Sequence, residues 1–173
     1  WRETRDPYRI LLAEVLLHRT RAIQVVPIYH RVLERYPTVY ALAAARLEDL
    51  ADLLRSLGLH WRVPLLHRMA QEVVNRFGGT VPGNVDMLRT LPGVGLYIAA
   101  ATACFAFDQP VPILDTNTVR VLSRLFRLDV QESSRKSRKF HTVMAQLLDR
   151  DQPRLFNLGL LDLAALICVP AMP

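Results

Sequence analysis

The stretch from Leu91 to Tyr97, which reads Leu-Pro-Gly-Val-Gly-Leu-Tyr, has the residue types of a tight turn between two helices. Its Pro-Gly-x-Gly centre leaves backbone amides bare at the start of the second helix, where the helix dipole favours an anion. We expect Leu91, Gly93, Val94 and Gly95 to form a hairpin that binds a DNA phosphate without reading sequence. The alternative is an ordinary helix–helix turn, because proline and glycine are common turn residues.

Asp115 follows Tyr97 by eighteen residues and directly precedes an expected helix. Aspartate is a favoured N-cap, so a purely structural role is the alternative. A catalytic carboxylate at the same place would be held rigidly and could meet the sugar of a nucleotide bound by the hairpin. Asp115 is a weak signal alone, and becomes the best catalytic candidate only in combination with the hairpin at this spacing.

Glu14 is a carboxylate within the apolar run from Ile10 to Leu17. Burying a carboxylate is costly unless it is paired or protonated, and burial raises its pKa. Such a group suits proton donation or hydrogen bonding to a base edge. The alternative is a glutamate at a helix surface or one paired with an arginine.

The elements that must position these residues are almost all helices. Asp6-Pro7 is an N-cap followed by proline at the first helical position, whereas Thr20 should cap the second helix and Pro27 should interrupt or restart it. No period-2 alternation persists long enough to predict a strand. Helices are expected over residues 7–18, 20–36, 38–45, 47–57, 64–77, 84–90, 95–107, 117–126, 137–148 and 153–168.

The composition bounds the class of protein. A chain of 173 residues that is 51% hydrophobic can bury a core, and its net charge of +6 favours a polyanionic partner. There is no apolar run long enough for a membrane span and no signal-peptide pattern. Two cysteines cannot form a disulfide framework, so we expect an intracellular protein, associated with the nucleoid if the source is prokaryotic.

Taken together, these residues resemble the helix-hairpin-helix (HhH-GPD) DNA glycosylase superfamily, which includes endonuclease III and the MutY adenine glycosylases. Within it, the chain is most similar to the Mig-type thymine/uracil mismatch glycosylases, chiefly through Tyr97, where endonuclease III has lysine and MutY usually serine. The resemblance covers nearly the whole chain and is carried by Trp1 to Tyr8, Glu14 to Thr20, Gly58-Leu59, Leu91 to Tyr97, Leu114 to Asn117 and Phe156 to Asp162.

The resemblance implies a monofunctional base-excision-repair glycosylase. Such an enzyme flips a thymine or uracil mispaired with guanine out of duplex DNA and hydrolyses its N-glycosidic bond. Asp115 would stabilise the oxocarbenium-like sugar and orient water, and Glu14 would line the base pocket. Tyr97 cannot form the Schiff base that a lysine would, so the strand stays uncut. The alternatives are a MutY-type adenine glycosylase, acting on adenine opposite guanine or 8-oxoguanine, and a non-catalytic DNA-binding module.

The resemblance also assigns residues that hold the opened duplex. Arg19 and Leu59 fall on positions that fill the vacated stack and wedge the strands apart, which offsets the cost of unstacking. His60, beside Leu59, would help to grip the opposite strand. The structural alternatives are a surface arginine, a core leucine and a packed aromatic ring.

Many superfamily members hold a [4Fe–4S] cluster with four cysteines spaced C-x6-C-x2-C-x5-C. Cys168 fits the first of these ligands, and the second would fall two residues after Pro173. One thiolate cannot hold a cluster, so we expect the full-length protein to supply the other ligands and this chain to be truncated before them. A monovalent cation at the hairpin is a further expectation.

The resulting architecture is all-α, with two helical lobes. Residues 7–107 would form a bundle that contains the hairpin, and residues 1–6 plus 108–173 the second lobe. The active site would lie in the cleft between them, with Asp115 and Tyr97 facing each other. The expected partner is double-stranded DNA with a mismatched or damaged base, bound by a monomer that contacts no membrane.

Overall fold

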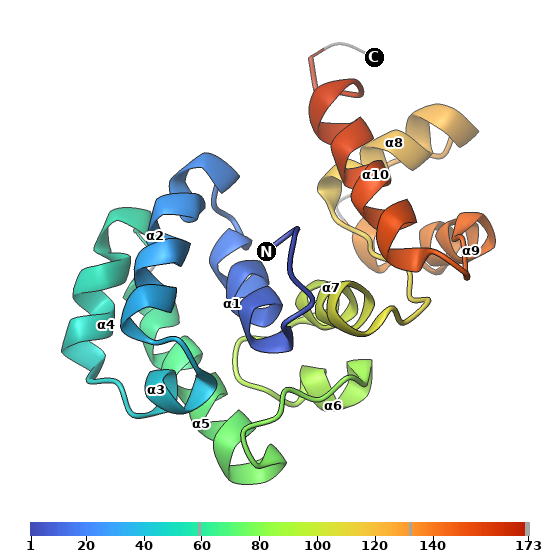
Figure 1. Cartoon of the computed structure of the whole chain (residues 1–173). Coiled ribbons are helices and arrows are strands. Elements are labelled where there is room, and N and C mark those ends of the chain that lie inside the picture. Colours follow the sequence, from blue (N-terminus) through green and yellow to red (C-terminus); the bar gives the residue numbers. More distant parts are fainter. Residues whose placement is uncertain (59, 132, 172–173) are drawn as a thin grey trace. The chain divides into compact units, whose positions relative to one another are not determined.

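The computed structural model describes residues 1–58, 60–131 and 133–171. Over these ranges it contains ten α-helices, three short 3-10 helices and no strand (Figure 1), which confirms the all-α prediction. The chain divides into two compact units, Trp1–Thr102 and Ala103–Pro173. Their bounds differ from the two expected lobes, because residues 1–6 belong to the first unit, where the Trp1 ring packs edge-on against Tyr29.

The first unit is a bundle built around α1 (Pro7–Leu17), which packs against α2 (Ala22–Arg35). Helices α3 (Val39–Ala43) and α4 (Leu47–Leu54) both pack against α5 (Val63–Phe77), as the ribbon in Figure 1 shows. Helix α6 (Val85–Arg89) and the first part of α7 (Leu96–Phe107) complete the unit. The core is centred on α1, whose buried residues are Tyr8, Ile10, Leu11, Leu12, Ala13, Glu14, Val15 and Leu16.

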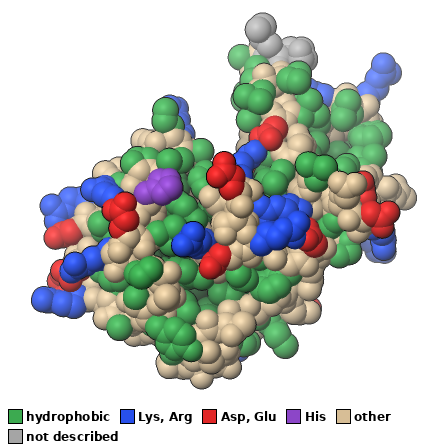
Figure 2. All heavy atoms as spheres, in the orientation of Figure 1, with side chains coloured by type: hydrophobic (Ala, Val, Ile, Leu, Met, Phe, Trp, Pro, Cys, Tyr) green, Lys and Arg blue, Asp and Glu red, His purple; other side chains and the backbone are tan. Residues whose placement is uncertain are grey.

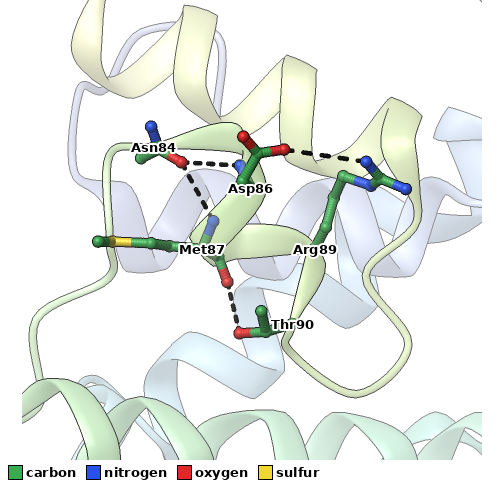
Figure 3. A network of polar contacts seen from close by, with 5 residues as sticks. All are labelled: Asn84, Asp86, Met87, Arg89 and Thr90. Carbon is green, nitrogen blue, oxygen red and sulfur yellow. Dashed lines mark hydrogen bonds and ion pairs between the residues drawn. The ribbon is translucent and has the colours of Figure 1, made fainter.

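Local hydrogen bonds begin and end the short helix that leads into the hairpin. The Asn84 side chain caps α6 by accepting from the amides of Asp86 and Met87, at 2.8 and 3.2 Å (Figure 3). At the other end the Thr90 hydroxyl donates to the carbonyl of Met87 at 2.7 Å. Because a helix this short is marginal by itself, these caps help to fix the point at which the chain turns toward Leu91.

Two expectations about the second helix are wrong. The N-cap of α2 is Arg21, since the Thr20 amide donates to the carbonyl of Leu17 at 3.0 Å and Thr20 thereby belongs to the turn that ends α1. Pro27 lies inside α2 without interrupting it. Proline removes one helical hydrogen bond, but the helix also buries an apolar face that favours continuity: Val25, Ile28, Tyr29 and Val32.

The second unit holds the rest of α7 together with α8 (Thr116–Phe126), α9 (Arg138–Leu147) and α10 (Pro153–Leu166). Helix α8 packs against both α9 and α10. Arg120 on α8 ties down the end of α10, because its Nε and Nη2 donate to the carbonyls of Cys168 and Ala164, each at 2.8 Å. One buried cluster in the core of this unit consists of Leu114, Val119, Leu122, Phe140 and Met144.

On the face drawn in Figure 2, Lys and Arg side chains lie among Asp, Glu and hydrophobic side chains. In the described ranges no helix is both long enough and apolar enough to cross a membrane.

Candidate functional site

The hairpin has buried apolar anchors and exposed glycines. Leu91 and Val94 are 3% and 6% exposed, and the Val94 amide donates to the Leu91 carbonyl at 3.1 Å to close the turn. Gly93 has a φ of 76°, a left-handed backbone conformation that residues other than glycine rarely adopt. Both Gly93 and Gly95 are exposed. The turn therefore presents backbone rather than side chains.

Helix α7 begins directly after this turn. Its first helical hydrogen bond runs from the Ala99 amide to the Gly95 carbonyl at 3.0 Å, so the amides before Ala99 precede the helical ladder. The positive end of the dipole of this 12-residue helix lies at the same place. This arrangement suits an oxyanion, as the phosphate-binding prediction requires.

A cavity of about 220 Å³ lies beside the hairpin, within the first unit. It is bounded by the hairpin, the end of α1 and the start of α5, and the half-buried Tyr97 lines it together with Gly93 and Gly95. The structure thus brings together three of the residues expected from the sequence. Glu14, 3% exposed on α1, is not among the described residues that line this cavity, although the next residue, Val15, is.

Arg62 also lines this cavity and was missed by the sequence analysis. It ends the 3-10 helix His60–Arg62 and is only 5% exposed. Its guanidinium lies over the Trp61 ring, 4.9 Å from the ring centroid. In a chain with 22 Lys and Arg residues, nothing in the sequence marks this arginine as buried.

Asp115 lies in the second unit as the N-cap of α8. One carboxylate oxygen accepts from the Thr118 amide and the other from the Asn117 side-chain amide, each at 2.7 Å. The Thr118 hydroxyl in turn accepts from the Asp115 amide at 2.8 Å, which completes a capping box. The carboxylate is partly buried and held in one orientation, so it meets the rigidity expected of either a cap or a catalytic group.

Comparison with known proteins shows to which family the chain belongs. The model of the HhH-GPD superfamily of base excision DNA repair proteins matches residues 12–146. The chain belongs to this superfamily. The resemblance drawn from the hairpin, Tyr97 and Asp115 is therefore confirmed at the level of the family.

Similar members of the HhH-GPD superfamily are named for thymine and uracil. The thymine-DNA glycosylase of Aeropyrum pernix is 39% identical over 179 residues, which span all of this chain and 79% of that protein. The thymine/uracil-DNA glycosylase of Pyrobaculum aerophilum is 38% identical, over all of this chain and 77% of that protein. A solved structure of a thermostable thymine-DNA glycosylase matches with a TM-score of 0.91 and 35% identity, over all of this chain and 80% of the other.

The structure describes two of the three residues that are expected to act on the opened duplex. Arg19 is exposed in the loop after α1, with a φ of 63° that is unusual for a residue other than glycine. His60 is exposed at the start of its 3-10 helix. Leu59, the expected wedge, lies outside the described residues. The DNA contacts of all three residues stay predictions.

Cys168 does not form a cluster site with other described residues. Its half-buried sulfur lies 3.2 Å from Arg124 Nη1, which donates to it. No group of three or more His, Cys, Asp or Glu side chains in the described ranges could hold a metal ion. The described residues thus offer one candidate cluster ligand, as the resemblance implies for this chain, and the [4Fe–4S] cluster stays a prediction. The chemistry proposed for this chain is that of its own side chains.

Proposed function

We propose that this protein is a monofunctional DNA glycosylase that hydrolyses the N-glycosidic bond of thymine or uracil mispaired with guanine in duplex DNA. The observation that carries the proposal is Tyr97, which lines the cavity beside the hairpin glycines in a chain similar over its full length to thymine/uracil-DNA glycosylases. A phenol at this position cannot form a Schiff base with the sugar, so hydrolysis is the reaction that remains.

In the proposed mechanism the hairpin amides and the start of α7 hold a phosphate of the damaged strand. The target nucleotide is extruded, because its glycosidic bond is inaccessible within the stacked duplex. The C1′–N bond then breaks with its electron pair leaving on the base, and the positive charge that develops on the sugar is stabilised by Asp115. Water attacks C1′ and its released proton passes through solvent to the departed base anion, which leaves a free neutral base and an intact abasic strand.

Asp115 suits this role because its two hydrogen bonds to Thr118 and Asn117 fix the carboxylate before substrate arrives. A preorganised charge need not reorient during the reaction, which is the basis of electrostatic catalysis. Glu14 is proposed as the group that contacts the flipped base. We further propose that Arg19, Leu59 and His60 act on the opened duplex, and that the enzyme works as a monomer inside the cell.

The test is a base-release assay on four duplexes that contain thymine or uracil opposite guanine, or adenine opposite guanine or 8-oxoguanine. We expect release of thymine and uracil, with no covalent adduct after borohydride treatment. Release of adenine alone would show a MutY-type enzyme, and a trapped adduct would show a lyase. Binding to all four duplexes without any base release would show a non-catalytic DNA-binding module.

A further inference from the structure

Arg62 has one bonded edge and one unbonded edge. Its Nη1 donates to the Val15 carbonyl at 3.1 Å. Its Nε and Nη2 are buried and have no hydrogen-bond partner among the residues that the structure describes. In a planar guanidinium these two nitrogens share one edge, and their N–H groups run parallel at the spacing that binds two oxygens of a carboxylate or phosphate.

A buried arginine with unbonded donors destabilises the folded protein. A buried charge is normally paired, and a buried N–H is normally hydrogen-bonded. Burial, and secondarily the charge of Arg19, lower the pKa of the Arg62 guanidinium, although an arginine keeps its proton in proteins. The folded protein therefore holds a cation with two unused donors close to a second cation, an arrangement that an anion would relieve.

The hairpin supplies an independent reason to place an anion here. Arg62, Gly93 and Gly95 line the same cavity, and α7 begins immediately after Gly95. The helix dipole and the amides that precede the helical ladder favour an oxyanion at this end of α7. A buried cation with two unbonded donors and a helix N-terminus thus meet at one cavity.

We propose that Arg62 is a further ligand of the DNA phosphodiester at the hairpin, with Nε–H and Nη2–H each donating to a phosphate oxygen. The inference deepens the proposed function in that it rests on DNA being bound at the hairpin. Such a contact carries no base information, so Arg62 strengthens binding equally for matched and mismatched duplexes.

We expect Trp61 to control access to this edge. The two nitrogens are buried, so a phosphate reaches them only when a neighbouring side chain moves. Trp61 lies against the guanidinium and is itself 55% exposed, which makes it the side chain that can move outward. In a Trp1→Phe background Trp61 is the sole tryptophan, since the chain has two, and its fluorescence reports this movement.

The experiment measures binding to duplexes that carry an uncleavable abasic analogue, over a range of salt concentrations. Arg62→Met replaces the arginine with an uncharged side chain of similar length and removes its two parallel N–H donors. The control variant, Arg68→Met, removes the same charge from an exposed position of α5 that does not line the cavity. We expect Arg62→Met to weaken binding about tenfold for every opposite base and to lower the slope of log K against log salt by about one. Arg68→Met should leave both unchanged.

Thermal melting separates this effect from misfolding. If Arg62→Met does not fold, Arg62→Lys replaces it, because lysine keeps the charge without the parallel donors, and it should bind several-fold more weakly than wild type. Wild-type affinity and salt slope in a folded Arg62→Met protein would overturn the proposal, as would wild-type binding by Arg62→Lys. A loss confined to guanine-containing sites would also overturn it, since that pattern marks a base contact.

Two further measurements identify the ligand and show whether the phosphate contact holds when the proposed function does not. Trp61 fluorescence should change on addition of duplex, and an equal change with inorganic phosphate alone would overturn the assignment to DNA. If wild type releases neither thymine nor uracil while Arg62→Met still shows the lower salt slope, the proposed function fails and the phosphate contact stands.

Discussion

Asp115→Asn is the substitution that best separates the two roles of this residue. The aspartate caps α8 through one oxygen that accepts from the Thr118 amide, and its other oxygen accepts from the Asn117 side chain. Asparagine has nearly the same shape but one acceptor and no charge. The substitution should therefore preserve the cap while removing the carboxylate that the proposed mechanism requires.

The stability cost follows from these two bonds. If the asparagine oxygen keeps the Thr118 amide, its NH2 group faces the Asn117 NH2 group, and one hydrogen bond worth about 0.5–1.5 kcal/mol is lost. Asn117 is exposed, so its freed amide can bond to water and the cost falls at the lower end of this range. Since asparagine caps helices as well as aspartate does, the melting temperature should fall by only about 1–3 °C.

The catalytic cost should be far larger. Loss of a charge or proton-transferring group that acts in the transition state lowers the rate by about 10²–10⁴-fold. The assay is single-turnover release of thymine opposite guanine, with enzyme in excess, alongside thermal melting of both proteins. A rate within about tenfold of wild type would refute the catalytic role. A fall in melting temperature above about 10 °C would refute the account of the cap.

Three further predictions concern single residues. Tyr97→Lys places an amine in the cavity, so borohydride should trap a covalent adduct with substrate DNA that wild type does not form. Gly79→Ala should lower the melting temperature more than Gly78→Ala, because both have positive φ but only the Cβ at 79 would overlap the Tyr40 ring; equal losses would contradict this. Burial raises the pKa of the Cys104 thiol from 9.0 to about 11. The free energy of unfolding should therefore fall as pH rises between these values, with a smaller fall in Cys104→Ala, as denaturant titrations can measure.

Features fixed by near neighbours in the chain were predictable. Asp6 accepts from the Arg9 amide at 2.9 Å, and Asn84 caps α6 as its position implied, because each of these bonds spans three residues or fewer. The left-handed turn at Gly93 follows the same logic, since a residue without a Cβ adopts a positive φ at the lowest steric cost. The N-cap role of Asp115, weighed as an alternative to catalysis, is likewise a local property and is present in the structure.

Features that depend on distant partners were not predictable. Pro27 should break a helix according to local rules, yet α2 continues through it and buries an apolar face. The burial of Arg62 depends on Val15, 47 residues earlier in the chain, and on a cavity completed by the hairpin. No pattern of spacing or composition near Arg62 distinguishes it from the exposed arginines around it.

The sequence by itself determined the family and the type of reaction to expect, because the hairpin glycines, Tyr97 and the capping aspartate are recognisable as residue types at fixed spacings. Only the tertiary structure decided which of the many cations is buried beside the hairpin with an unbonded edge. The physical reason is that helix caps and turns depend on bonds between near neighbours. Burial, and the hydrogen bonds it leaves unmade, depend on the packing of segments far apart in the chain.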